Sequence, residues 1–322
     1  MTTFLTPPVV HPHTGRFTGP FDGSTTAAEV VADLDLGGRR AVVTGGASGI
    51  GVETARALAA TGACVTLAVR DVDAGAATAA AITESTGNEL VSVAPLDLAD
   101  PTSVRAFVST WDGPLHMLVN NAGVMATPLT RTPRRWELQF ATNHLGHFAL
   151  TTGLFPALLA AGGARVVSVS SGAHLRSAVD FDDIHFHGRP YDPWIAYGQS
   201  KTANVLFAVE ANRRWSGDGI AVNAVMPGGI RTGLQRHLDT DELAAMDARS
   251  SGIGWKTPEQ GAATSVLLAA SPLVEGIGGR YFEDCAEALP ADGTYGRGVA
   301  PYALDPEAAE RLWDVSWAHL RA

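Results

Sequence analysis

The 322-residue sequence predicts an α/β fold, a single doubly wound parallel sheet of about seven strands with helices on both faces. Three observations support this prediction. Short runs rich in β-branched residues alternate with segments of helical period. The runs are apolar with little alternation, as expected for parallel strands that are covered on both faces. A glycine-rich turn joins the first run to the helical segment that follows it.

The pattern divides the chain into an N-terminal arm, residues 1–36, and one domain, residues 37–322. Residues 1–22 are rich in Pro, Thr and Gly without helical or strand period, which predicts an irregular segment. Thr26 and Glu29 form a capping box ahead of a short helix. In the domain, strands are expected at residues 41–44, 64–69, 90–96, 116–120, 165–170 and 220–225.

Composition narrows the class of protein. The 23 Lys and Arg against 33 Asp and Glu give a formal charge of -10 with no basic stripe, so nucleic acid is not an expected partner. Cys64 and Cys285 are the only cysteines, which predicts reduced thiols rather than a disulfide scaffold. No apolar run reaches the roughly 18 residues that span a bilayer, and the N-terminus lacks a signal-peptide pattern. These features predict a cytoplasmic protein without a membrane span.

The turn after the first predicted strand has the pattern of a dinucleotide site. The run GGASGIG at 45–51 contains Gly45, Gly49 and Gly51, which allow a tight turn and a close backbone approach to a pyrophosphate. That phosphate would lie at the positive N-terminus of the following helix. A lone glycine pattern is weak, but here it lies between a strand and a helix, as the motif requires. Ser48 and Ile50 belong to the same predicted site.

The end of the second strand indicates which dinucleotide binds. Val69 stands where an NAD site usually has its acidic residue, and Arg70 follows it. An arginine there can pair with a 2′-phosphate, which favours NADP(H), although NAD(H) stays possible. Asp71 is either the acid displaced by one position or, more simply, a helix N-cap. Asp97, next to Leu98, closes the third strand; its carboxylate either takes the adenine amino group or forms a turn.

Tyr197 and Lys201 stand four residues apart in the run YGQSK. On a helix they share one face, so a phenol and an ammonium would lie close together. This geometry suits proton transfer, but such pairs are also common on ordinary helices.

Together with the other motifs, this pair resembles the short-chain dehydrogenase/reductase family over about residues 38–318. The motifs that carry this resemblance are TGGASGIG at 44–51, NNAG at 120–123, the asparagine at 143, SS at 170–171, YGQSK at 197–201 and PGGIRT at 227–232. The insertion at about 173–196 and the segments SKTANVLF, KTPEQGAAT and GGRYFEDC look like the retinol-dehydrogenase and WW-domain-oxidoreductase branch. The resemblance implies a Rossmann-like domain and an oxidoreductase acting on alcohols or carbonyls.

The resemblance also implies a catalytic group, Asn143, Ser171, Tyr197 and Lys201. Tyr197 would be the general acid/base, and Ser171 would polarise the substrate oxygen. Lys201 would bind the nicotinamide ribose, and its charge together with that of the oxidised nicotinamide would lower the Tyr197 pKa from its usual value of about 10. Asn143, on a helix with a distorted backbone, would hold a water that links Lys201 to solvent.

Further cofactor contacts follow from the same resemblance. Asn120 and Asn121 would tie the fourth strand to its neighbours, and the backbone after them would close on the cofactor. The PGGIRT segment would meet the nicotinamide carboxamide. The implied contact residues are Asn121, Ala122, Gly123, Pro227, Gly228, Ile230 and Thr232.

The substrate is predicted only as a class, a lipophilic or cyclic secondary alcohol with its ketone, or an aldehyde. Specificity is expected in residues 125–135, 173–196 and 229–256, the last with the mixed composition of a mobile lid. The second hypothesis is a catalytically silent NADP(H)-binding redox sensor that acts through a protein partner. The resemblance implies a homodimer or homotetramer.

No metal site is predicted. The histidines of HPH at 11–13 have no carboxylate or thiol partner nearby, and those of HFH at 185–187 lie in the insertion, which in both cases favours a solvated loop over a metal site. Trp194 and Trp255 either line the substrate pocket or serve packing.

Overall fold

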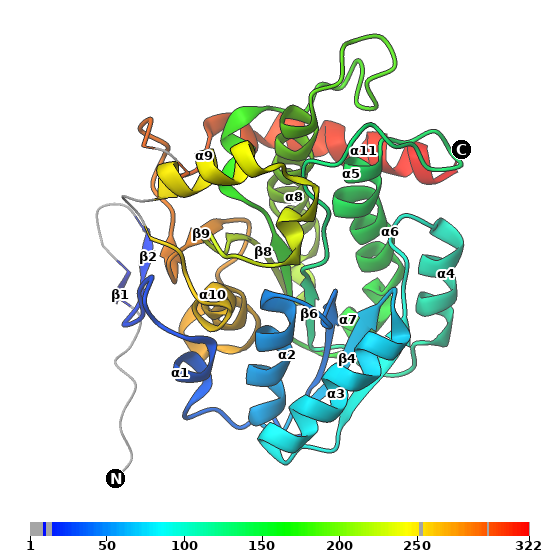
Figure 1. The fold of residues 1–322 in the computed structure, drawn as a ribbon. Helices are drawn as coiled ribbons and strands as arrows, with labels where there is room; N and C mark the ends of the chain where they lie inside the picture. Colours follow the sequence, from blue (N-terminus) through cyan, green and yellow to red (C-terminus); the bar gives the residue numbers. More distant parts are fainter. Residues whose placement is uncertain (1–8, 11–14, 251–253, 295, 322) are drawn as a thin grey trace.

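One mixed sheet runs through the centre of the molecule. The structure is a computed structural model that describes residues 9–10, 15–250, 254–294 and 296–321. Within these residues the strand order is β1-β2-β10-β9-β8-β7-β6-β3-β4-β5 (Figure 1). The strands are β1 (Val9–Val10), β2 (Phe17–Thr18), β3 (Arg40–Thr44), β4 (Cys64–Val69), β5 (Val91–Pro95), β6 (Met117–Asn120), β7 (Ala164–Val169), β8 (Ile220–Met226), β9 (Tyr281–Glu283) and β10 (Ala286–Glu287).

The strands from β3 to β9 are parallel to one another, and β3 has β4 on one side and β6 on the other. The chain therefore winds in two directions from β3, which confirms the doubly wound parallel sheet. All six strands expected from the sequence are present, each within one residue at either end. Buried apolar residues on both faces, such as Val42 and Val43 of β3, explain why their pattern showed little alternation.

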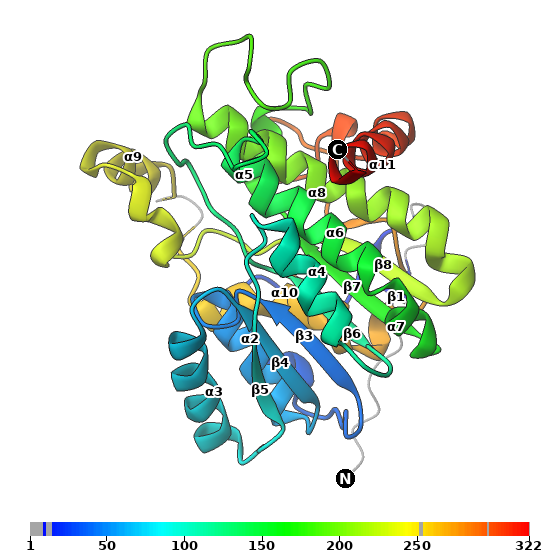
Figure 2. The ribbon, with the colours of Figure 1, turned by 90° about the vertical axis from the view of Figure 1, so that its right-hand side faces the viewer.

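Helices cover both faces of the sheet (Figure 2). One apolar core lies under α1, α2, α3 and α10, and the other under α4, α6, α7 and α8. The helices are α1 (Ala27–Val31), α2 (Ile50–Ala60), α3 (Val72–Thr86), α4 (Pro101–Thr110), α5 (Leu138–Phe140), α6 (Gly146–Gly153), α7 (Phe155–Ala160), α8 (Pro193–Trp215), α9 (Thr240–Ser250), α10 (Pro258–Ala270) and α11 (Pro306–Arg321).

The N-terminal arm differs from its prediction. An irregular segment was expected over residues 1–22, but β2 pairs with β10 at the sheet edge and β1 pairs with β2. Phe17 is fully buried, and its backbone N–H donates to the Glu287 carboxylate at 2.9 Å. An edge strand offers unpaired backbone groups, so a two-residue strand can join it without an alternating pattern. The capping box of Thr26 and Glu29 is confirmed at the start of α1.

Two expectations from composition can be compared with the fold. Cys64 and Cys285 are both free thiols, as predicted. Among the described residues, the helices are all too short or too polar to cross a membrane.

Candidate active site

The glycine-rich turn after β3 lies against the other segments expected to bind the cofactor. A Cβ at Gly45 would lie 3.0 Å from the Ala122 Cα, and one at Gly49 would lie 3.1 Å from the Thr232 methyl carbon. Gly49 also has a φ of 55°, a conformation that favours glycine, and it precedes α2 without a side-chain cap. The first N–H groups of α2 are thus available to a phosphate. The turn forms a tight cradle that fits a dinucleotide.

Thr44, the last residue of β3, fastens this turn to the end of β6. Its hydroxyl oxygen accepts hydrogen bonds from the backbone N–H groups of Asn121 and Ala122, both at 2.9 Å. The Asn121 amide donates to the Thr44 carbonyl at 2.8 Å, and the Asn120 amide donates to the Thr151 hydroxyl at 2.8 Å. The expected structural role of the two asparagines is confirmed.

Arg70 and Asp71, which follow β4, have different environments in the structure. Asp71 is the N-cap of α3, and its carboxylate accepts a hydrogen bond from the Ala74 N–H at 3.0 Å. The simpler interpretation of Asp71 therefore holds, and the exposed Arg70 stands beside it. At the end of β5, the Asp97 carboxylate accepts from the Ala99 N–H at 2.9 Å, which is a turn contact. Its contact with adenine stays a prediction.

Tyr197 and Lys201 lie one turn apart on the long helix α8. Both are almost fully buried, each with 3 % of its surface exposed. The Lys201 Nζ lies 5.7 Å from the centre of the Tyr197 ring and donates to the Val169 carbonyl at 2.9 Å. Ser171, which follows β7, makes a hydrogen bond with the Tyr197 hydroxyl. The structure thus brings three of the four predicted catalytic side chains together at the carboxyl ends of the strands.

Burial controls the protonation of this pair. It raises the pKa of Tyr197 to about 12, opposed by the hydrogen bond from Ser171. It lowers the pKa of Lys201 to about 7. In the protein chain by itself, burial dominates the pKa of Tyr197, and the lower value expected from Lys201 together with the oxidised nicotinamide stays a prediction for the cofactor complex. Tyr197 therefore keeps its proton at neutral pH, which suits a proton donor.

Asn143 lies in a π-helical turn, Ala141–Leu145, between α5 and α6, which confirms the expected distortion. Its amide donates to the Val124 carbonyl and the Ser200 hydroxyl, and its oxygen accepts from the Val124 N–H, all at 2.9 Å. A Cβ at Gly123 would lie 3.2 Å from the Asn143 oxygen and 3.5 Å from the Lys201 Nζ. Asn143, Gly123 and Lys201 are neighbours, and the water between them stays a prediction.

Sequence reasoning missed His147, which is fully buried next to this turn. Its Nδ1 lies 2.9 Å from the Asn143 carbonyl oxygen, so Nδ1 carries the proton, because a carbonyl only accepts. Its Nε2 then accepts the proton of the Thr44 hydroxyl, also at 2.9 Å. Burial lowers the pKa of His147 to about 4, which keeps the ring neutral. The two histidines of NHLGHF were the available signal in the sequence. Only the fold shows that His147 links Thr44 to Asn143 through two hydrogen bonds.

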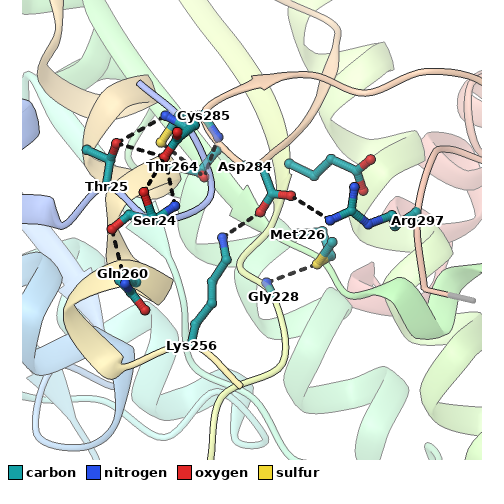
Figure 3. A network of polar contacts seen from close by, with 12 residues as sticks. Ser24, Thr25, Met226, Gly228, Lys256, Gln260, Thr264, Asp284, Cys285 and Arg297 are labelled. Atoms are coloured by element: carbon teal, nitrogen blue, oxygen red, sulfur yellow. Dashed lines mark hydrogen bonds and ion pairs between the residues drawn. The ribbon is translucent and has the colours of Figure 1, made fainter. Parts of the chain in front are cut away.

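The segment after β8 is fastened to the sheet edge by a second group that the sequence did not reveal. The Lys256 N–H donates to the Gly229 carbonyl at 2.8 Å, and the Lys256 stem covers Gly228 so closely that a Cβ there would lie 2.7 Å from its Cδ. The Lys256 Nζ forms an ion pair with the Asp284 carboxylate at 2.6 Å, and Arg297 lies 3.5 Å from the same carboxylate (Figure 3). Residues 228–230 are thus held between β8 and Lys256.

Apolar side chains surround Tyr197. All three segments in which specificity was expected contribute to this cluster, and their role in specificity stays a prediction. The apolar neighbours are Met125, Ala126, Ala173, Trp194, Leu234, Leu238 and Met246. Trp194 belongs to the cluster, whereas Trp255 stacks with Arg231.

Of the two histidines at 185–187, His187 is exposed, as predicted for a solvated loop, whereas His185 is not. His185 is buried, and its Nδ1 accepts from the Glu137 N–H at 3.2 Å. Arg131 donates to the His185 and Phe186 carbonyls at 2.6 and 2.8 Å, which draws this loop onto the body. His11 and His13 lie outside the described residues. Within the part of the chain that the structure describes, no group of three or more His, Cys, Asp or Glu is placed to hold a metal ion.

A glycine-rich cradle on a doubly wound sheet, facing a buried tyrosine and lysine, defines an oxidoreductase of the nucleotide-binding α/β class. The family model of short chain dehydrogenases matches residues 39–243, and the chain belongs to the short-chain dehydrogenase/reductase family.

Relatives support the retinol-dehydrogenase-like branch. A "Probable oxidoreductase" of Streptomyces antibioticus is 57% identical over 90% of this chain and 100% of that protein. Human retinol dehydrogenase 12 is 41% identical over 88% of this chain and 87% of that protein. Among solved structures, the active-site complex of Pseudomonas aeruginosa RhlG with NADP is 27% identical, with a TM-score of 0.63, over 78% of this chain and 96% of that one.

Proposed function

We propose that this oxidoreductase interconverts an alcohol and a carbonyl, with Tyr197 as the general acid/base. In reduction, Tyr197 gives its phenolic proton to the carbonyl oxygen; in oxidation, it takes the proton of the alcohol. The observation that carries the proposal is the buried Tyr197, hydrogen-bonded to Ser171 and stacked above Lys201 on α8. The raised pKa of the phenol favours its role as proton donor at neutral pH.

Bound NAD(P)(H) would supply or accept the hydride. The turn at 45–51 and the N-terminus of α2 would hold its pyrophosphate, and residues 121–123 and 227–232 would close around the rest. Ser171 would donate a hydrogen bond to the substrate oxygen as negative charge develops there. Lys201 would bind the ribose hydroxyls, and Asn143 would hold the water that links Lys201 to solvent.

We propose NADP(H) as the preferred cofactor, with NAD(H) possible. Support comes from the exposed Arg70 at the tip of β4, where Asp71 is engaged as a cap, and from the NADP bound by RhlG. Arg70→Ala is expected to weaken NADPH binding about 10-fold or more, the value of one charge-assisted hydrogen bond, and to leave NADH binding unchanged. Fluorescence titration measures both affinities, with Arg105→Ala as a control on α4. An unchanged NADPH/NADH ratio would mean that Arg70 is only a surface charge.

Lys256 is expected to affect cofactor binding without affecting chemistry. Lys256→Met keeps the stem over Gly228 but removes the ion pair with Asp284, so KM for NADPH should rise about 2- to 5-fold with little change in kcat. Glu275→Gln, which removes an ion pair with Arg165 elsewhere, is the control. Steady-state kinetics at saturating substrate measures the effect, and a fall in kcat with constant KM would contradict it.

The substrate proposed is a lipophilic or cyclic secondary alcohol with its ketone, or an aldehyde. The apolar cluster around Tyr197 supports this class, because apolar side chains favour the binding of an apolar substrate. In the same proposal, residues 1–36 are an arm, residues 37–322 form the catalytic domain, residues 173–196 are a substrate insertion, and residues 229–256 are a lid.

A screen of carbonyl compounds and alcohols, followed by NADPH absorbance, tests the function. Turnover by the wild type that depends on Tyr197 supports it. The alternative, a catalytically silent redox sensor, would bind NADPH tightly and turn over none of these compounds.

Assembly and location stay proposals. A homodimer or homotetramer is proposed from the family. The faces of α6 and α8 that carry Phe148 and Phe207 are covered by Trp313 of α11, so pairing through these helices would have to include α11. A cytoplasmic location is proposed from the composition.

A further inference from the structure

One side chain, Trp194, contacts both the catalytic phenol and the helix that covers it. Trp194 stands three residues before Tyr197 on α8, and the two rings meet edge to face with their centres 6.3 Å apart. The indole Nε1–H donates a hydrogen bond to the Glu242 carboxylate of α9 at 3.0 Å. Arg176 stacks on the same indole, 5.0 Å from its centre. Trp194 therefore joins the site to α9.

The Glu242 carboxylate is held ready for this contact by its own helix. Its second oxygen accepts from the Asp239 N–H at 3.1 Å, while the Asp239 carboxylate accepts from the Glu242 N–H at 2.8 Å. These reciprocal bonds form a capping box at the start of α9. Because the first carboxylate oxygen projects toward Trp194, the cap and the contact with the indole are made by one side chain.

The segment that carries α9 covers the phenol. Leu238 is buried in the same apolar cluster as Tyr197, and Leu234 and Met246 pack against this cluster, in which Tyr197 is 3 % exposed. A substrate oxygen must come within about 2.6–3.2 Å of the phenol to exchange a proton. These apolar side chains must therefore move when a substrate enters. Figure 2 shows α9 at the outside of the molecule, beside the start of α8. At this position α9 can move without displacing the rest of the domain.

We propose that Trp194 is a positioning and specificity-determining residue. Its hydrogen bond to Glu242 holds α9 closed over Tyr197, and its ring forms a wall of the space in which the substrate lies. The hydrogen bond joins α8, on one side of that space, to α9, on the other side. A substrate that fits beneath Leu238 and Met246 therefore reacts while α9 is closed. The role of Trp194 in substrate specificity rests on the proposed function. Its role in holding α9 closed does not.

Limited proteolysis within residues 231–250 tests the closure without any substrate, because cleavage follows the population of the open form when opening is fast. Trp194→Phe keeps an aromatic wall but lacks the donor, and Glu242→Ala lacks the acceptor. Each is expected to raise the cleavage rate about 3- to 10-fold. The double variant should be cleaved no faster than the faster single variant, because both changes remove the same bond.

Two further variants separate the contact from the cap. Glu242→Gln keeps an acceptor oxygen and a capping side chain, so its cleavage rate should stay within about 2-fold of wild type. Asp241→Ala removes a neighbouring exposed carboxylate and should leave the rate unchanged. Additive effects in the double variant, or a wild-type cleavage rate for Trp194→Phe, would overturn the proposal.

Kinetics with an accepted substrate tests the second role. Trp194→Phe is expected to change KM for the substrate several-fold while KM for NADPH stays constant; equal changes in both would overturn the specificity role. If the screen finds no substrate at all, the proposed function fails, yet the cleavage rates still decide whether Trp194 and Glu242 hold α9.

Discussion

Replacing Tyr197 with phenylalanine is expected to lower kcat about 10²- to 10⁴-fold, the usual contribution of a positioned general acid or base. The ring and its apolar contacts remain, so the fold and the cofactor affinity should stay close to those of the wild type. The loss should appear in both reaction directions, because the same hydroxyl gives the proton in reduction and takes it in oxidation. Initial rates on the best substrate of the screen, together with NADPH titrations, measure these effects.

Tyr302→Phe is the matched control for the Tyr197 variant. It also removes a tyrosine hydroxyl, which in Tyr302 donates to the His174 carbonyl at 2.7 Å and has no part in the proposed proton transfer. Its turnover should stay within a few-fold of wild type. If Tyr197→Phe turned over at the same rate as Tyr302→Phe, another group would have to move the proton, and the mechanism proposed above would be wrong.

The features that the sequence predicted well are contiguous in the chain. The strand before Gly45, the turn itself and the four-residue spacing of Tyr197 and Lys201 can each be recognised from a short stretch of residues. The π-turn at Asn143 was expected as well, but only through the resemblance to a family, because its own residues have no distinctive period.

The features that were missed depend on residues distant in sequence. The contacts of Trp194 with Glu242 and of Lys256 with Asp284 join segments whose separation is fixed only by the fold. The pairing of β2 with β10 is of the same kind, because two residues carry no pattern. The rise of the Tyr197 pKa by burial was not foreseen, because a sequence does not state how deeply a side chain is buried.

Lys201 is the second residue for which a large effect is expected. Lys201→Met should lower turnover about 10²-fold, because it removes the attraction between the Lys201 ammonium and the negative charge on the Tyr197 oxygen. For unit charges about 6 Å apart at an effective dielectric constant of about 20, this attraction amounts to about 3 kcal/mol. At the same time the variant should be more stable than wild type at pH 7, because burying an ammonium is unfavourable. The Val169 carbonyl keeps a donor in this variant, since the Asn204 amide also binds it at 3.0 Å.

The pH dependence of stability distinguishes this explanation from simple repacking. Burial lowers the pKa of Lys201 from 10.5 to about 7, so between these values the unfolded chain binds more protons than the folded one. The wild-type unfolding free energy therefore gains about 2 kcal/mol from pH 7 to pH 9, a gain that Lys201→Met lacks. The advantage of the variant in Tm should be largest at pH 7 and should shrink toward pH 9. Calorimetry at both pH values measures it, with Lys256→Met as the control. If the difference in Tm between Lys201→Met and wild type stayed constant with pH, packing rather than the buried charge of Lys201 would cause it. The proposed role of Lys201 as a buried cation beside Tyr197 would then be wrong.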